Sequence, residues 1–279
     1  EGYQTAIYTN KPAADTTSAV AAATWFPYAI AEEALLLRWA LSTYRFYQTG
    51  RFDPQNNAYL MTMKNVQPDG DIGTPKWAND VFNFEHLSPQ DIPQNYDSGY
   101  KFRNIAVRTP DYLAQLAEHY KTQGGNIHSR DVQSFDELSE DILINCTGVY
   151  AGALTEDTDI TPGRGQVLVT DNPGISDFIT DKVSITYVYP HKEYIIVGGC
   201  VETGNWSLET DPARSEDIMQ RALLLEPKLK DAKIQKTLVG LRPVRKPAPV
   251  RLEAETTPTG RTIIHNYGHA GAGWSLCWG

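Results

Sequence analysis

Arg242 is the residue whose chemistry and surroundings most favour a binding role. It lies in the segment Gly240-Leu241-Arg242-Pro243-Val244-Arg245. A planar guanidinium can hold a carboxylate through two parallel hydrogen bonds. For an isolated arginine a structural ion pair is the ordinary interpretation, so the argument for Arg242 depends on the motifs around it.

The C-terminal segment offers two further features. Residues 268–279 form a glycine-rich turn that leads into a helix, and a helix start presents free N–H groups and partial positive charge. His265 and His269 lie four residues apart, which on a helix would suggest a metal site. Here they fall in a strand and a turn with no third ligand in view, so we interpret both as structural and expect no metal.

Short elements must position these residues. The patterns predict strands over residues 5–8, 141–145, 250–255 and 262–267, two strands within 184–201, and helices over 31–48, from 109 to about 123, and over 213–225. Thr109-Pro110-Asp111 predicts a helix start with Thr109 as the N-cap. Residues 51–108 indicate loops with short strands, and the strand at 141–145 is expected to be buried. The small residues Ala19–Ala23 permit close approach of the backbone to a ligand, although a tight helix–sheet contact is the more ordinary explanation.

The order of elements indicates the fold class. Strand–helix–strand material lies at the start, middle and end of the chain, with antiparallel-looking strands between. This order favours an α/β (α+β) fold in which a Rossmann-like nucleotide-binding domain is interleaved with a mostly antiparallel β-sheet domain.

Composition excludes several function classes. The net charge is −9 with scattered Lys and Arg, which disfavours a nucleic-acid partner, and no apolar run approaches the roughly 20 residues of a membrane span. Three cysteines, Cys146, Cys200 and Cys277, argue against a disulfide framework and for an intracellular, reducing compartment. The sequence opens on Glu1 with neither an initiator Met nor a signal peptide, so we expect a truncated N-terminus.

Several motifs occur together in an order that resembles the D-amino-acid oxidase family, which includes D-aspartate oxidases. They are the Arg242 segment, Val250-Arg251-Leu252-Glu253, Ile264-His265-Asn266-Tyr267-Gly268-His269-Ala270-Gly271-Ala272-Gly273, Ile144-Asn145-Cys146-Thr147-Gly148-Val149-Tyr150-Ala151-Gly152, Pro162-Gly163-Arg164-Gly165-Gln166, Gly204-Asn205-Trp206 and Leu225-Glu226-Pro227. The resemblance runs from about Ile7 to Gly279.

The resemblance implies FAD as cofactor and a discontinuous FAD-binding domain. That domain would comprise residues 1–28, 107–165 and 255–279, and the substrate-binding domain residues 29–106 and 166–254. Family members open with a strand and a Gly-rich pyrophosphate loop, a unit absent from this sequence, so we expect weak FAD binding by the chain as printed. Asn10 stands where relatives carry the acid that grips the ribose.

The resemblance also implies the site. Arg242 and Tyr187 would bind the substrate carboxylate, the carbonyl of Gly271 would accept the amine, and Val201 would line the side-chain pocket. No protein group is expected as a catalytic acid or base, because the hydride passes to the flavin. The expected FAD contacts are Thr17, Ser18, Thr24, Trp25, Val132, Thr147, Gly148, Arg164, Ala270, Gly271, Ala272, Gly273, Trp274 and Ser275.

The implied reaction is oxidation of D-amino acids by oxygen to 2-oxo acids, ammonia and hydrogen peroxide. D-aspartate oxidases carry arginines at two places that here read Thr180 and Val201, so neutral, apolar substrates are expected, unless Lys182 supplies the charge. The alternatives are a D-aspartate oxidase and a non-catalytic scaffold or binding fragment without FAD. A cytoplasmic location, or a peroxisomal one in a eukaryote, and a homodimer stay open.

Overall fold

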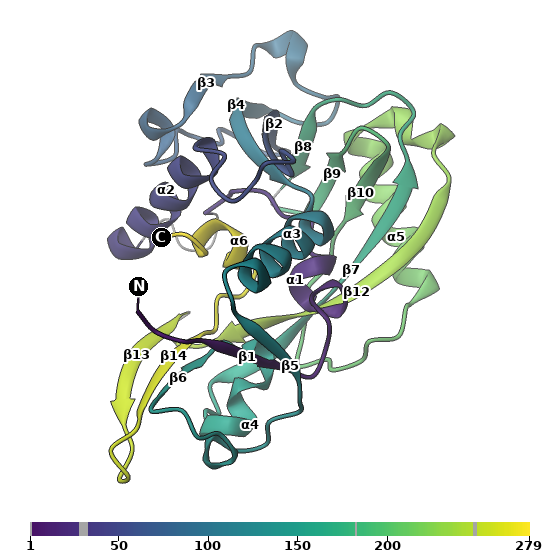
Figure 1. The fold of residues 1–279 in the computed structure, drawn as a ribbon. Coiled ribbons are helices and arrows are strands. Elements are labelled where there is room, and N and C mark those ends of the chain that lie inside the picture. The colour runs from purple at the N-terminus through teal and green to yellow at the C-terminus, as the bar shows by residue number, and fades with distance from the viewer. Residues whose placement is uncertain (1, 28–32, 182, 248–249) are drawn as a thin grey trace.

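A computed structural model describes residues 2–27, 33–181, 183–247 and 250–279. Its largest feature is a nine-stranded sheet in the order β11-β7-β10-β9-β8-β2-β4-β3, with β12 also paired to β7 (Figure 1). The strands are β2 (Ala58–Gln67), β3 (Phe82–His86), β4 (Ser98–Val107), β7 (Ile160–Asp171), β8 (Phe178–Asp181), β9 (Thr186–Pro190), β10 (Tyr194–Gly198), β11 (Glu202–Thr203) and β12 (Ile234–Arg245). All neighbours are antiparallel except β2 and β8.

The region 51–108 corrects the sequence prediction of short strands. β2 and β4 each span ten residues and pair antiparallel along their whole length. Polar residues hide this in the sequence, because Asn65 and Asn104 are fully buried. Each side-chain amide donates to a neighbouring hydroxyl: Asn65 Nδ2 donates to Tyr100 Oη at 2.7 Å, and Asn104 Nδ2 donates to Thr24 Oγ1 at 2.7 Å.

Two small sheets make up the lower body of the molecule in Figure 1. Their strands are β1 (Ala6–Thr9), β5 (Asn126–Ser129), β6 (Ile142–Asn145), β13 (Arg251–Thr256) and β14 (Thr262–Tyr267). β1 pairs parallel with β5, β6 pairs parallel with β14, and β13 pairs antiparallel with β14. The domain boundaries remain a prediction, but this pairing favours starting the last FAD-domain segment near residue 250.

The expected burial of the strand at 141–145 is corrected. Successive side chains of a strand point to opposite faces, and only Leu143 and Asn145 are buried here. Ile142 is 47% and Ile144 63% exposed, since no described residue covers their face.

The helices agree with the sequence patterns, with one correction. They are α1 (Thr17–Val20), α2 (Ala34–Gln48), α3 (Thr109–Thr122), α4 (Ala151–Thr155), α5 (Pro212–Leu225) and α6 (Gly273–Leu276), with 3-10 turns η1 (Ala13–Asp15), η2 (Ala78–Asp80), η3 (Pro89–Asp91), η4 (Phe135–Glu137), η5 (Gly148–Tyr150) and η6 (Pro227–Asp231). Residues 31–32 of the predicted helix 31–48 lie outside the described part of the chain. Thr109 is already helical, and Arg108 is the N-cap. Thr109 Oγ1 instead donates to the carbonyls of Ala19 and Ala21, so tertiary contact replaces capping.

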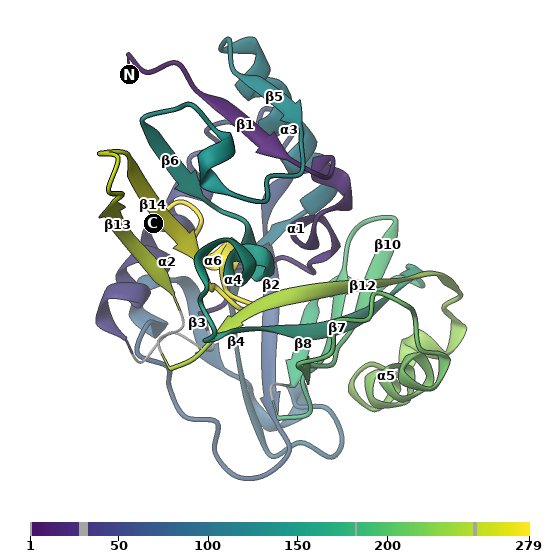
Figure 2. The ribbon, with the colours of Figure 1, turned by 90° about the horizontal axis from the view of Figure 1, so that it is seen from below.

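The large sheet has an apolar cluster on each face. Ile218 and Ala222 of α5 pack against Val188 and Leu168 on one side. Trp25, Tyr189 and Phe178 belong to the cluster on the other side, which faces α2 and α6. Figure 2 shows α5 and α1 on opposite sides of β7 and β12. Among the described helices, none is long and apolar enough to cross a membrane.

Candidate active site

The Arg242 side chain packs against glycine residues of the neighbouring strand β7. It pairs with Gly163 across β12 and β7, and its guanidinium covers Gly165, where an added Cβ would come within 2.7 Å of Cζ. Arg242 Nη1 donates to Cys200 O at 2.9 Å. No carboxylate of the described residues forms a salt bridge with Arg242, so this charge is not neutralised by that part of the chain.

The Tyr187 ring also packs against two glycine residues, Gly198 and Gly199. It pairs with Gly198 of β10 on one side and with Thr180 of β8 on the other. An added Cβ would lie 2.6 Å from Tyr187 Cε2 at Gly198 and 2.9 Å from Cε1 at Gly199. Glycine at both positions therefore allows the ring to lie flat across β10.

The tripeptide Gly198-Gly199-Cys200 joins the two side chains. The Tyr187 ring covers its first two residues, and the Arg242 guanidinium binds the carbonyl of its third. Strand alternation puts Arg242 and Tyr187 on the face opposite α5. A guanidinium and a phenol thus lie beside each other on one face, an arrangement that suits a small carboxylate.

The C-terminal turn docks beside Arg242. Ala270 N donates to Pro243 O at 2.9 Å, and His269 forms an antiparallel bridge with Val244. Gly271 therefore lies one residue from a direct contact with the strand that carries Arg242. Burial lowers the pKa of His269, so its imidazole is neutral at neutral pH. α6 follows and has only four described residues.

α1 closes the same region from above. Thr17 Cγ2 would lie 3.3 Å from a Cβ at Gly240, and Trp274 Nε1 donates to Ser18 O at 3.1 Å. Ser275 Oγ accepts from Phe26 N at 2.9 Å. The structure thus brings together the expected FAD contacts of residues 17–18 with those of 270–275.

Thr24 and Trp25 lie between these groups. Thr24 Oγ1 donates to Ile105 O at 2.9 Å. The Trp25 indole is fully buried and donates to Ala40 O, so its ring belongs to the aromatic core and only its main chain could meet a cofactor.

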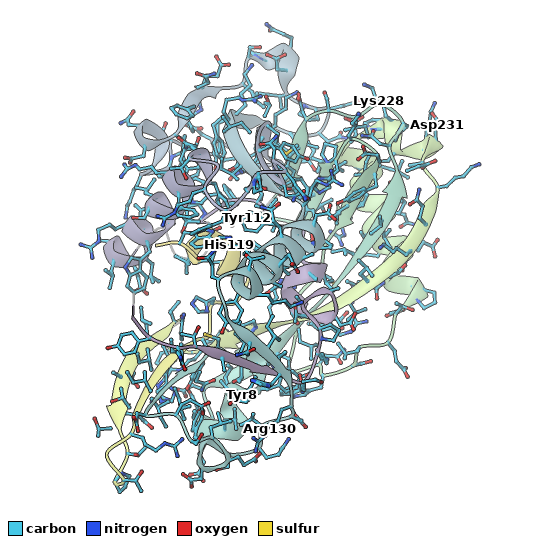
Figure 3. The ribbon with its side chains drawn as sticks, viewed as in Figure 1. Tyr8, Tyr112, His119, Arg130, Lys228 and Asp231 are labelled. Atoms are coloured by element: carbon cyan, nitrogen blue, oxygen red, sulfur yellow. The ribbon has the colours of Figure 1, made fainter. Side chains whose placement is uncertain are left out.

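Val132, Thr147 and Gly148 follow the carboxyl ends of β5 and β6, the edge where α/β sheets bind ligands. Lys11, after β1, lies 6.0 Å from the Tyr150 ring centroid, which draws the loops after β1 and β6 together. Figure 3 shows Tyr8 and Arg130 in this same lower body. Asn10 Nδ2 donates to Asp131 Oδ1 at 3.0 Å.

These residues fit a dinucleotide. Gly148 has a φ of 61° and no heavy atom within 4 Å of an added Cβ, so its main chain faces open space. β12 contacts both η5, which contains Gly148, and α1. The two groups of expected FAD contacts therefore flank one strand, as an extended cofactor requires.

Arg164 occupies the opposite face of β7. Its side chain is 2% exposed and pairs with Glu202 at 3.1 Å. It also donates to Ser207 O, Gln166 Oε1 and Glu209 O. These partners use its donors within the protein, and its expected contact with FAD stays a prediction.

The predicted specificity residues differ in exposure. Val201 is 44% exposed, and its Cγ1 would lie 3.6 Å from a Cβ at Gly163, as would Arg242 Cβ. Thr180 is buried, and its hydroxyl donates to Thr186 O at 3.1 Å. Lys182 lies outside the described residues.

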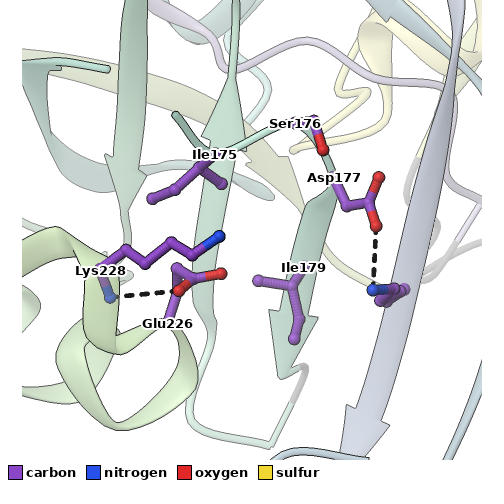
Figure 4. Close-up of a pocket in the computed structure, with 7 residues that line it drawn as sticks. Ile175, Ser176, Asp177, Ile179, Glu226 and Lys228 are labelled. Atoms are coloured by element: carbon purple, nitrogen blue, oxygen red, sulfur yellow. Dashed lines mark hydrogen bonds and ion pairs between the residues drawn. The ribbon is translucent and has the colours of Figure 1, made fainter. Parts of the chain in front are cut away.

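Two surface cavities lie on the described part of the chain, and one of them includes residues of this site. One of about 150 Å³, shown in Figure 4, is lined by Lys64, Asp177, Glu226 and Lys228 with Ile175, Ser176 and Ile179. Lys64 and Asp177 form a salt bridge at 2.9 Å, so these two charges neutralise each other. The other, about 250 Å³, lies at the α5 edge of the large sheet and includes Val201 and Arg221.

Four residues that shape the site have no role among those predicted from the sequence. Gly165, Gly198 and Gly199 accept the two side chains, and Cys200 accepts the Arg242 bond. The signal was present in the motifs Gly163-Arg164-Gly165 and Gly198-Gly199-Cys200, because glycine inside a strand marks a close approach by another group.

Comparison with known proteins places this geometry in a family. The model of the DAO family, FAD dependent oxidoreductase, matches residues 1–279. The chain is 36% identical over 283 residues to the D-amino-acid oxidase of Rubrobacter xylanophilus, covering 100% of this chain and 86% of the relative. It is 30% identical over 299 residues to human D-aspartate oxidase, covering 98% and 83%.

Solved structures agree in fold. Glycine oxidase from Geobacillus kaustophilus superposes with a TM-score of 0.82 at 15% identity, covering 97% of this chain and 84% of that one. The expected α/β fold with an antiparallel sheet and the family resemblance are thereby confirmed. The chain belongs to the DAO family of FAD-dependent oxidoreductases.

Proposed function

We propose that this protein oxidises neutral, apolar D-amino acids to 2-oxo acids, with release of ammonia and hydrogen peroxide. The observation that carries the proposal is the Arg242 guanidinium, which lies on Gly165 beside Tyr187 without a described carboxylate partner. A cation so placed is suited to the carboxylate common to all amino acids.

The chain's own residues would bind and orient the substrate. Arg242 holds the carboxylate in a bidentate pair, and the Tyr187 hydroxyl adds a further bond. The carbonyl of Gly271, beside the Ala270–Pro243 contact, accepts the amine. Together these groups present the α-carbon in one orientation.

The amine loses its proton before the α-hydrogen leaves. FAD, when bound, supplies the hydride acceptor and passes the electrons on to oxygen. Thr17, Ser18 and residues 270–275 would hold it near the substrate, while Val132, Thr147 and Gly148 would hold its far end. Molecular oxygen and the amino acid are the small-molecule partners, and an intracellular location belongs to the same proposal.

The preference for apolar side chains rests on Val201 and Thr180. Val201 offers an apolar wall, and the Thr180 hydroxyl is already bonded to Thr186 O. Neither position supplies a cation to an acidic side chain, and an unpaired carboxylate in a closed site is costly. Arg214 and Arg221 line the cavity beside Val201, but they pair with Glu202 and Asp217.

The test has two parts. The purified full-length protein should be yellow, and D-alanine should bleach its flavin absorbance without oxygen, which a non-catalytic scaffold would not do. A peroxide assay at fixed pH then compares D-alanine, D-methionine, D-phenylalanine, D-aspartate and D-glutamate. The highest catalytic efficiency on D-aspartate would identify a D-aspartate oxidase instead.

A further inference from the structure

Arg221 of α5 lies behind the Tyr187 side of the sheet and ties two of its segments together. Nη1 donates to Ser184 O at 2.8 Å and to Thr186 Oγ1 at 2.5 Å. Nη2 donates to Gly199 O at 2.9 Å and pairs with Asp217 at 3.0 Å. One guanidinium thus spans the turn before β9, the end of β10 and its own helix.

These acceptors adjoin the proposed carboxylate site. Thr186 directly precedes Tyr187, and Gly199 lies under the Tyr187 ring. The next residue, Cys200, accepts the Arg242 bond. Gly199 N also donates to Ile185 O at 2.8 Å, so the two segments are linked on both sides of the peptide.

A rigid fork suits this task. The guanidinium is planar and its donors point in fixed directions, so the separation between the 184–186 segment and Gly199 is set by one group. A lysine would offer a single ammonium at the end of a flexible chain and would reach fewer of the acceptors.

Arg214, two turns earlier on the same face of α5, provides the contrast. It lines the same cavity of about 250 Å³, and both arginines contact Asp217. Arg214 binds Glu202 at 3.1 Å, yet no described contact joins it to residues 184–186 or Gly199. The two side chains have the same charge and line the same cavity, but they bind different segments of the chain.

We propose that Arg221 is a positioning residue of the substrate-carboxylate site, acting from the back of the sheet through Gly199 and the segment before Tyr187. This inference rests on the proposed function. Without Arg221, the distance between Tyr187 and the Cys200 carbonyl, which accepts the Arg242 hydrogen bond, is no longer fixed. Carboxylate binding weakens, while FAD binding does not change.

The experiment compares Arg221→Met with Arg214→Met in the flavin-loaded protein. KM and kcat are measured for D-alanine, and the Kd of propanoate, its analogue without the amine, is read from the flavin absorbance. Arg221→Met is expected to raise both KM and the propanoate Kd about tenfold or more, equivalent to at least about 1.4 kcal/mol, with kcat within about threefold of wild type. Arg214→Met is expected to leave all three within about twofold, and Arg221→Lys to recover part of the loss.

Equal KM and Kd changes in the two methionine variants would overturn the inference, as would a change confined to FAD affinity or melting temperature. If Arg221→Met does not fold, Thr186→Val removes the hydroxyl that accepts from Arg221 and from Ser184 Oγ. This variant should raise the propanoate Kd about threefold; no change would also overturn the inference. A wild-type protein that binds propanoate but oxidises no D-amino acid would contradict the proposed function. The propanoate Kd values of Arg221→Met and Arg214→Met would then still test the role of Arg221.

Discussion

Two arginines on neighbouring strands of one sheet have opposite surroundings. Arg164 of β7 pairs with Leu241, and Arg242 of β12 pairs with Gly163, so they are one register step apart and point to opposite faces. Arg164 has a carboxylate and three further acceptors and is 2% exposed on its side chain. Arg242 has one described acceptor, the carbonyl of Cys200.

From this difference we propose that Arg164 is structural and that Arg242 binds the substrate. A guanidinium has five N–H donors. Those of Arg164 bind Glu202 of β11, Gln166 of β7 and two carbonyls in the loop before α5. Most donors of Arg242 have no described acceptor, and its guanidinium lies on glycine, which would let a flat ligand approach. An arginine within a family motif is therefore not enough to predict a ligand contact; the face of the strand on which it lies must also be known.

The largest expected effect is on catalysis by Arg242→Met. Removing the carboxylate's partner strands its charge, which we expect to cost on the order of 3–5 kcal/mol, or about 10²–10³-fold or more in kcat/KM for D-alanine. The measurement is steady-state peroxide production with FAD content checked by absorbance. A loss of less than about tenfold, about 1.4 kcal/mol, would contradict the carboxylate role.

Arg164→Met should act on stability instead. Breaking its buried pair with Glu202 is expected to lower the free energy of unfolding by about 3 kcal/mol, measured by urea denaturation. Turnover per bound flavin should stay within about threefold of wild type. Unchanged stability with a weakened FAD affinity would reverse the comparison and favour the cofactor contact that the sequence predicted for Arg164.

Gly165→Ala tests whether glycine is needed beneath the Arg242 guanidinium. Its new Cβ would come within 2.7 Å of Arg242 Cζ, so the guanidinium must move, and we expect about a tenfold lower kcat/KM. In an Arg242→Met background the same change should add less than about twofold, because the group it displaces is gone. Equal losses in both backgrounds would show that Gly165 acts elsewhere.

Val201→Arg should have the smallest effect. It adds a cation beside Gly163 at a position 44% exposed, so solvent screening limits the gain. We expect the ratio of efficiencies on D-aspartate and D-alanine to rise about fivefold, near 1 kcal/mol. Val201→Met, of similar length but uncharged, is the control, and a similar rise there would remove charge as the cause.

Local signals in the sequence predicted the shorter elements well. The helix predicted over 213–225 is α5, which begins at Pro212, and the Asp211 side chain caps it by accepting from Ala213 N and Arg214 N. β14 has the predicted bounds, 262–267. Such elements are specified by neighbours in the chain.

The long central strands escaped prediction for a physical reason. β7 contains Pro162, Gly163 and Gly165, and β12 contains Gly240 and Pro243, residues that disfavour strands in isolation. Their pairing with each other, from Ile234↔Thr170 to Arg245↔Ile160, supplies the hydrogen bonds that override propensity.

The sequence by itself determined the family, and with it the types of residue available: arginines, a tyrosine on β9 and glycines at regular places in the strands. Only the tertiary structure decided which arginine has several acceptors within the protein and which has one described acceptor. Side chains alternate across a strand, so Arg164 and Arg242 are assigned to opposite faces by the register of β7 and β12. On one face Glu202 and the loop before α5 surround the guanidinium; on the other, glycine leaves room beside it. That choice depends on contacts between segments about 80 residues apart, which no local pattern encodes.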